Sequence, residues 1–125
     1  MKVTCGTDII EIDRIRDSIE NVGERFIKKV FTDREIEYCE SKKGQKYQHY
    51  AGRFAAKEAA FKAVSAKLDD KYSVCWKDFE VVNDKQGRPK LNLLNIDTDR
   101  IESIDVSISH CKLYATANVV VLYND

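Results

Sequence analysis

Three charged side chains, Asp8, Glu58 and Lys62, have the types and spacing that metal-assisted phosphate chemistry needs. Two carboxylates together with oxygen atoms of a phosphorylated ligand suit Mg²⁺, which takes few protein ligands and keeps water or phosphate oxygens for the rest. A lysine one helical turn from the metal ligand could stabilise charge on a transferring phosphoryl group. The residues permit such a site if the fold brings Asp8 to the helix that carries the other two.

Glu58 and Lys62 also have a simpler interpretation. A glutamate followed four residues later by a lysine is the commonest surface ion pair on helices, and it contributes roughly 0.2 to 0.5 kcal/mol. On the helix alone this surface interpretation is favoured. The case for a site therefore depends on residues elsewhere in the sequence.

A further polar stretch, Ser107-Ile108-Ser109-His110, is expected at the end of a strand and could converge with the same site. His110 is equally well explained as an ordinary loop histidine, because histidine is intermediate between buried and exposed residue types. Neither serine lies in a nucleophile-elbow sequence, and the chain has no P-loop motif. The basic loop at residues 42–46 is more simply a solvated connection than a phosphate contact.

The helix that must hold Glu58 and Lys62 covers at least residues 50–63. Its alanines fall on one side at helical spacing: Ala55, Ala56, Ala59, Ala63 and Ala66. A face without bulk lets another element pack close to the helix backbone. We therefore expect this helix to be central in the fold.

Asp8 is expected at the end of an opening strand, in which apolar and polar residues alternate from Val3. A helix capped by Asp13 should follow and run to about Val22, before Gly23. A second helix is expected at residues 24–31. The capping-box sequence from Thr32 to Glu35 then starts a third helix, which ends near Ser41.

The last part of the sequence is typical of antiparallel strands. Strands are expected at residues 79–82, 90–91, 104–109 and 114–122, with a hairpin loop at 83–89 in which Gly87 is free to take positive φ. The order of one strand, several helices and then strands predicts an α+β fold, with a mainly antiparallel sheet packed against the long central helix. A chain of 125 residues fits one domain, spanning 1–125.

Composition excludes several classes of function. Lys and Arg number 21, as do Asp and Glu, so that a net charge of zero gives no electrostatic case for a nucleic-acid partner. No segment resembles a membrane span or a signal peptide, which makes a cytoplasmic location the expectation. The four cysteines have no C-x-x-C pair, and we expect them to be reduced and mostly buried.

Two stretches resemble the signature motifs of the 4′-phosphopantetheinyl transferases. They are GTDIIEIDRI at residues 6–15 and RFAAKEAAFKA at residues 53–63. The spacing between them, the chain length and the 107–110 stretch before the last strand resemble the short group of this family, the holo-acyl-carrier-protein synthases. The resemblance spans nearly the whole chain.

This resemblance implies transfer of 4′-phosphopantetheine from coenzyme A to a serine of apo-acyl carrier protein in fatty acid biosynthesis, releasing adenosine 3′,5′-bisphosphate. Asp8 and Glu58 would bind Mg²⁺, and Lys62 would offset charge on the leaving phosphate. The resemblance further implies a homotrimer with each site between neighbouring subunits. The remaining implied site residues are Arg53, Ser109 and His110 for coenzyme A, and Arg14, Arg25, Phe26 and Phe54 for docking of the carrier.

Several alternatives stay open at this stage. The base that takes the serine proton could be Glu58, Asp8 or a metal-bound water, since phosphoryl transfer gains more from positioning and electrostatics than from a strong base. A non-catalytic module that binds coenzyme A or a carrier would share these motifs. A Mg²⁺-dependent phosphohydrolase could use the same carboxylates. The docking helix also has mixed charge, because its acidic residues interleave with arginines: Asp13, Asp17, Glu20 and Glu24 with Arg14, Arg16 and Arg25.

Overall fold

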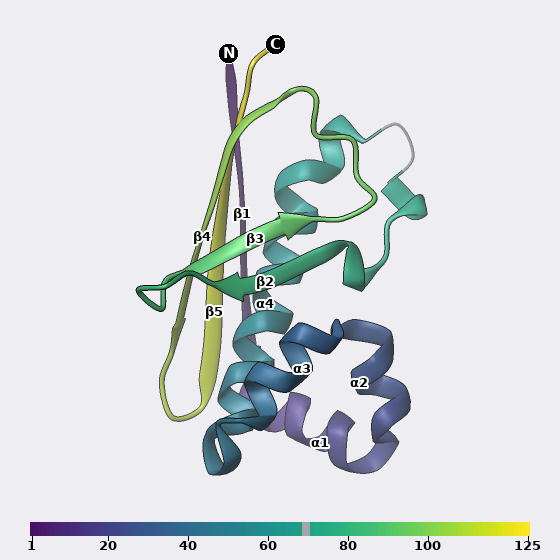
Figure 1. The fold of residues 1–125 in the computed structure, drawn as a ribbon, viewed down its shortest axis with the longest axis vertical. Coiled ribbons are helices and arrows are strands. Elements are labelled where there is room, and N and C mark those ends of the chain that lie inside the picture. The colour runs from purple at the N-terminus through teal and green to yellow at the C-terminus, as the bar shows by residue number, and fades with distance from the viewer. Residues whose placement is uncertain (69–70) are drawn as a thin grey trace.

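A computed structural model describes residues 1–68 and 71–125, and it places a long helix against two antiparallel sheets (Figure 1). The larger sheet has the strand order β1-β5-β4. Its strands are β1 (Lys2–Glu11), β4 (Ile101–His110) and β5 (Tyr114–Tyr123). The smaller sheet is a hairpin of β2 (Phe79–Asn83) and β3 (Pro89–Leu93). The predicted α+β fold with antiparallel strands and a long helix is confirmed.

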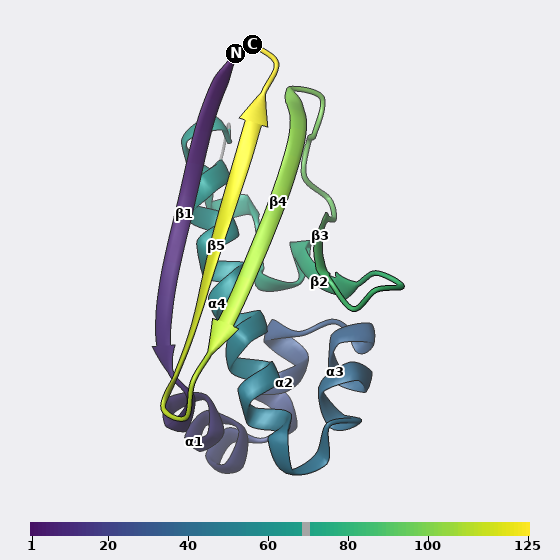
Figure 2. The ribbon, with the colours of Figure 1, turned by 90° about the vertical axis from the view of Figure 1, so that its left-hand side faces the viewer.

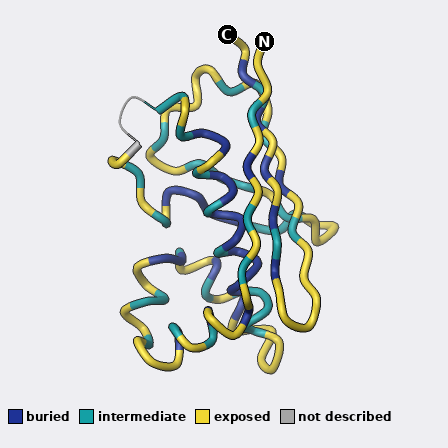
Figure 3. The backbone as a smooth tube through the Cα atoms, turned by 180° about the vertical axis from the view of Figure 1, so that it is seen from behind, coloured by how far each residue is buried: buried dark blue, intermediate teal, exposed yellow. Residues whose placement is uncertain are grey.

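Helix α4 (Lys46–Val64) is the element around which the main core is built. Its alanines pack on the inner side chains of the larger sheet, where Val106, Ala117, Val119 and Val121 are buried. Figure 3 shows the buried stretch of this helix running behind the strands. The expected alanine contact is confirmed for Ala55, Ala56, Ala59 and Ala63, whereas Ala66 is exposed in a short 3-10 turn after the helix.

Strand β1 approaches α4 closely at Gly6. A Cβ atom at this position would overlap the carbonyl oxygen of Ala59 and would lie 3.0 Å from the backbone nitrogen of Ala63. The hydroxyl of Thr4 donates a hydrogen bond to the Ala63 carbonyl at 2.6 Å. Alternate residues of a strand point to the same face. Asp8, two residues beyond Gly6, therefore also faces the helix.

Three short helices cover one end of α4 (Figure 2). They are α1 (Ile12–Val22), α2 (Glu24–Val30) and α3 (Asp33–Glu40). Gly23, with φ of 77°, separates the first two. The predicted capping box of α3 is confirmed, because the Thr32 side chain accepts from the Glu35 amide and the Glu35 side chain accepts from the Thr32 amide.

The remaining elements are short 3-10 turns and the hairpin loop. The turns are η1 (Lys43–Gln45), η2 (Ser65–Lys67), η3 (Lys71–Ser73) and η4 (Trp76–Asp78). In the hairpin, the Asp84 carboxylate accepts hydrogen bonds from the amides of Gln86 and Arg88, each at 2.9 Å. Gly87 has φ of 84°. The predicted loop and its positive-φ glycine are confirmed.

Two expectations, one about the first strand and one about the helix that follows it, are wrong. Strand β1 continues to Glu11, so that Asp8 lies within it, opposite Ala117, and not at its end. The extra length follows from β5, which continues to pair with Ile9 and Ile10. Helix α1 then begins at Ile12, and Asp13 lies in its first turn, where it does not act as the N-cap.

The expectation that the cysteines are mostly buried is also wrong. All four are free thiols, but only Cys39 is buried, and Cys5, Cys75 and Cys111 are exposed. Cys5 is exposed because its side chain alternates with Gly6 to the outer face of β1. Cys111 is exposed because it follows β4 in the turn to β5.

Candidate active site

Asp8 and Lys62 meet between β1 and α4. The Lys62 ammonium donates to the Asp8 carboxylate, with 3.4 Å between Nζ and Oδ1, and to the Thr7 carbonyl oxygen at 2.9 Å. The side chain of Asp8 is 19% exposed, whereas that of Lys62 is 52% exposed. The carboxylate is therefore held in place, and the lysine has room to turn toward a ligand.

Glu58 is half-buried one turn before Lys62 on α4. Burial raises the pKa of the Glu58 carboxyl, the negative charge of Asp8 raises it further, and Lys62 lowers it. The charge of Asp8 therefore acts on Glu58, which lies one helical turn before the Lys62 that contacts Asp8. No ion pair joins Glu58 to Lys62 in the described part of the chain, because Lys62 turns to Asp8. The interpretation of Glu58 and Lys62 as a simple surface ion pair is therefore wrong.

The donor set fits a hard divalent cation. Two carboxylates that repel each other would be stabilised by a shared positive charge, and their oxygen atoms are the ligands that Mg²⁺ prefers. Across residues 1–68 and 71–125, no cluster of three or more His, Cys, Asp or Glu side chains could hold a metal ion. A pair of carboxylates suits Mg²⁺ because this ion commonly completes its shell with water and phosphate oxygens.

A cleft of about 470 Å³ opens beside Glu58. Its walls come from α4, from α2 and from the segment that leads into β2, and they are mainly apolar: Lys29, Lys57, Glu58, Phe61, Tyr72, Val74, Cys75, Trp76 and Phe79. Cavities of this size accept small organic ligands. An extended and largely uncharged group could lie there with its reactive end next to Glu58.

One wall of the cleft contains a buried ion pair that the sequence did not predict. The Lys57 ammonium lies 2.7 Å from Glu35 Oε1, and both side chains are fully buried. Burial lowers the pKa of Lys57, and the charge of Glu35 opposes this effect. Helical spacing alone gave no signal for Lys57, because α4 buries residues on several of its sides. Glu35 was identified only as part of the capping box.

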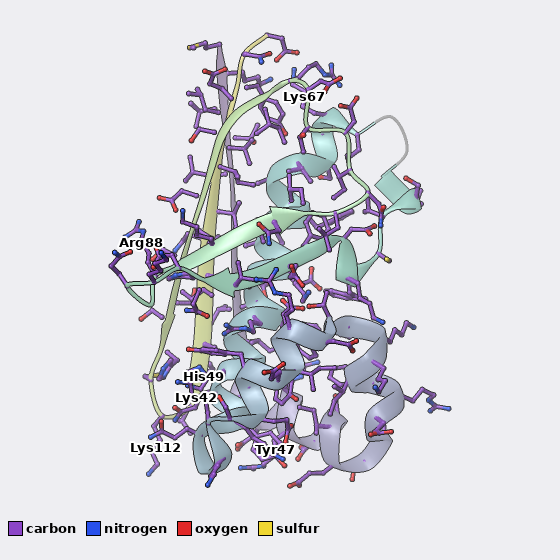
Figure 4. All side chains as sticks on the ribbon, viewed as in Figure 1. Lys42, Tyr47, His49, Lys67, Arg88 and Lys112 are labelled. Carbon is purple, nitrogen blue, oxygen red and sulfur yellow. The ribbon has the colours of Figure 1, made fainter. Side chains whose placement is uncertain are left out.

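Arg53 and His110 form a basic cluster with Lys42 and His49. Lys42 and His49 are labelled in Figure 4 at the end of the molecule where β4 turns into β5. The His49 and His110 rings are 6.2 Å apart. The pKa of His49 is lowered by burial first, and then by the positive charges of Arg53, Lys42 and His110. A concentration of cationic groups suits an anionic ligand.

Arg53 itself is held firmly in this cluster. Its side chain is 4% exposed, its Nη2 donates to the Asn83 side-chain oxygen at 2.6 Å, and its guanidinium lies 4.0 Å from the Tyr38 ring centroid. Its Nε is buried with no hydrogen-bond partner among the described residues. Ser109, in contrast, is exposed on the outer face of β4, away from the helix. The structure therefore does not bring Ser109 together with Asp8 and Glu58 within one chain.

The predicted docking residues lie on the helical end of the molecule. Phe26 stacks on Phe54 with ring centroids 6.5 Å apart, and Phe54 stacks on Trp76 at 4.9 Å. Arg14 on α1 and Arg25 on α2 are exposed. Because Trp76 also lines the cleft, this row of aromatic rings connects the cleft to the helical surface. Trp76 was not singled out from the sequence.

The described helices include none long and apolar enough to cross a membrane.

Comparisons with known proteins identify the family of this chain. A model of the 4′-phosphopantetheinyl transferase superfamily matches residues 4–119. The holo-[acyl-carrier-protein] synthase of Ruminiclostridium cellulolyticum is 45% identical over 130 residues, covering 100% of this chain and 96% of that protein. A holo-(acyl-carrier-protein) synthase from Bacillus anthracis in complex with CoA (3′,5′-ADP) has a TM-score of 0.75 and 37% identity, with 94% of each chain covered.

A Chronobacterium ammoniagenes ACPS–CoA complex covers 100% of both chains, with a TM-score of 0.83 and 28% identity. The matched region includes both motifs, and with them Asp8, Glu58 and Lys62. The chain belongs to the 4′-phosphopantetheinyl transferase superfamily.

Proposed function

We propose that this chain transfers the 4′-phosphopantetheine group of coenzyme A to a serine hydroxyl of an apo-acyl carrier protein. The serine oxygen forms a bond to the β-phosphorus of coenzyme A as its proton passes to Glu58, to Asp8 or to water, the bond from that phosphorus to the bridging oxygen breaks, and adenosine 3′,5′-bisphosphate leaves with that oxygen. The observation that carries the proposal is the Asp8–Glu58 carboxylate pair beside an apolar cleft, in a chain of this superfamily.

Asp8 and Glu58 are the residues that would hold Mg²⁺ in this proposal. The ion would supply positive charge that neutralises the diphosphate of coenzyme A for attack. The negative charge of Asp8 raises the pKa of the Glu58 carboxyl, which supports this assignment because a shared cation would offset that charge. Lys62 is half exposed and bound to Asp8 through one long contact, so that it can turn to the leaving phosphate and stabilise its charge.

The proposed binding of coenzyme A uses two regions. The cleft beside Glu58 would take the pantetheine arm, because its walls are mainly apolar and Glu58 itself lines it. The cationic cluster with Arg53 and His110 would take a phosphate group, and the unpartnered Nε of Arg53 supports this role. Ser109 would contribute from the outer face of the sheet, to the site of a neighbouring subunit.

The carrier would dock on the helical end, through Arg14 and Arg25 and the stacked rings of Phe26 and Phe54. Part of the mixed charge of α1 is neutralised within the helix, since Arg16 pairs with Asp13 at 2.8 Å. We propose that residues 1–125 act as one transferase domain. The proposal expects the reaction in the cytoplasm, where the four free cysteines would stay reduced.

The outer face of the larger sheet would form the trimer interface. Val3, Ile9 and Val120 are 62%, 66% and 47% exposed on this face. Exposed apolar patches of this kind favour association, and association would place the outer face of one subunit beside the site of the next. This arrangement would let Ser109 contribute to a neighbouring pocket from that face, whereas the His110 ring lies 6.2 Å from the His49 ring of its own chain and would act from the cationic cluster.

Substituting Val120→Asp is expected to dissociate this trimer, because each interface would bury an unpaired charge. Val22→Asp is the matched control, since Val22 is 44% exposed but lies at the end of α1. Sedimentation velocity should give a monomer mass for V120D and a trimer mass for V22D and the parent protein. A monomeric parent, or an unchanged trimer in V120D, would exclude this interface.

The proposed reaction is tested by incubating the protein with coenzyme A, Mg²⁺ and an apo-acyl carrier protein. Mass spectrometry should show one 4′-phosphopantetheine group added to the carrier, and chelation of the metal should stop the addition. Free phosphopantetheine without carrier would indicate a hydrolase. Binding of coenzyme A without any product, with carriers of fatty-acid and polyketide type, would indicate a binding module and would overturn the proposal.

A further inference from the structure

The Lys57 ammonium is saturated with partners inside the protein. It pairs with Glu35 Oε1 at 2.7 Å, and it donates to the main-chain carbonyl oxygens of Trp76, at 3.2 Å, and of Phe79. Since a lysine ammonium has three N–H donors, each donor has a partner. The side chain is fully buried, although α4 carries it only one residue before the half-exposed Glu58.

These contacts join two walls of the cleft. Lys57 and Glu58 are consecutive on α4, whereas Trp76 and Phe79 belong to the segment through η4 into β2, which forms another wall of the cleft. The two carbonyl bonds therefore tie the backbone that carries Glu58 to the backbone that carries Trp76. Glu35 is fixed in turn, because its Oε2 accepts from the Val81 amide at 2.8 Å.

Stability alone does not account for this arrangement. A buried ion pair is often no more stabilising than apolar residues of similar volume, because desolvation of the two charges offsets their attraction. The bonds to Trp76 and Phe79 are different in kind, since an apolar side chain at position 57 could fill the space but could not hold two carbonyl oxygens.

We infer that Lys57 is a positioning residue, which sets the separation between Glu58 and the Trp76 wall of the cleft through its bonds to the Trp76 and Phe79 carbonyl oxygens. This inference rests on the proposed transferase function. It assigns to Lys57 no contact with substrate. Residues that orient metal ligands without binding the metal themselves typically change activity by about 10- to 100-fold when they are substituted.

Two single substitutions separate positioning from stability. Both Lys57→Met and Glu35→Gln break the same ion pair and leave one buried charge without its partner, so that both should lower the melting temperature. Only K57M removes the ammonium from the cleft wall. Measured at a temperature at which circular dichroism shows both variants folded, kcat should fall about 10- to 100-fold in K57M and stay within about twofold of the parent in E35Q.

The double variant K57M/E35Q carries neither buried charge and should recover much of the lost melting temperature. Its kcat should nevertheless stay as low as that of K57M. This variant also keeps the test valid if K57M alone does not fold. Recovery of the parent kcat in the double variant would overturn the inference, as would equal kcat losses in K57M and E35Q.

Trp76 offers a readout that does not depend on turnover, because it is the single tryptophan of the sequence. Its emission should shift to longer wavelength in K57M and in the double variant, as the wall gives water access to the indole, and it should be unchanged in E35Q. An unchanged emission in K57M would contradict the inference. If the parent protein transfers nothing to any carrier, the proposed function fails. The emission of the three variants still tests whether Lys57 holds the Trp76 wall of the cleft in place.

Discussion

Glu58→Gln is expected to reduce transfer to the carrier by at least about 100-fold while leaving the fold intact. Glutamine has nearly the same shape but lacks the negative charge that would hold the divalent cation with Asp8. Substituting a residue that only orients a metal ligand typically lowers activity by about 10- to 100-fold. Substituting a metal ligand itself should lower activity at least as much. Initial rates at several Mg²⁺ concentrations give the measurement, with the exposed α3 residue Glu37→Gln as the control.

The same variant should melt at or slightly above the temperature of the parent protein at neutral pH. The pKa of Glu58 is raised in the folded state, so that its contribution to stability is fully present below its ordinary pKa and is lost as the pH rises through the raised pKa. Glutamine cannot ionise and avoids that loss. The difference should disappear below about pH 4, where both states bind the proton. A variant that unfolds, or one that keeps its Mg²⁺-dependent turnover, would return Glu58 to a structural role.

Gly6→Ala is expected to destabilise the protein by about 3 kcal/mol, the upper end of the usual range for overpacking. The added Cβ would overlap the Ala59 carbonyl oxygen, and backbone atoms cannot rotate away as a side chain can. For a chain of this size the melting temperature should fall by roughly 10 °C. Because Asp8 lies two residues further along the same strand face, a shift of β1 should also reduce kcat, by about 100-fold for a displacement near 1 Å.

Gly44→Ala is the matched control for this prediction. A Cβ at Gly44 has nothing within 4 Å, and no positive φ requires glycine there. Thermal unfolding followed by circular dichroism, together with the carrier-labelling rate, should leave G44A close to the parent protein. Equal melting temperatures for G6A and the parent would mean that β1 and α4 can separate without loss of stability. This result would contradict the inference that close packing of β1 on α4 positions Asp8.

Local rules predicted local structure well. The capping box of Thr32 and Glu35 and the positive-φ glycine at position 87 depend only on residues within a few positions, and both are present. The alanine face of α4 was likewise visible in the sequence, because small residues at helical spacing permit close packing. These features were enough to predict an α+β fold with a central helix.

Contacts between distant segments were beyond the same rules. Spacing alone could not bring Asp8 to Glu58, and only the resemblance of the two motifs to a known family suggested that the residues meet. Lys57 was missed because its ion pair joins two helices whose packing no local pattern encodes. The cysteines were misjudged because average burial by residue type ignores the alternation of β1, which turns Cys5 outward.

The strand order β1-β5-β4 also determines when this protein can fold. The middle strand of the larger sheet is β5, the last in the chain, so that neither β1 nor β4 has a strand neighbour in this sheet until β5 has been synthesised. Contacts this distant in sequence slow folding, because a long loop must close before any hydrogen bond of the ladder forms. During translation, β1 therefore remains an unpaired edge, prone to pairing with other chains, while α4 is already complete. The carboxylate of Asp8 reaches its final place only when the two ends of the described chain have come together.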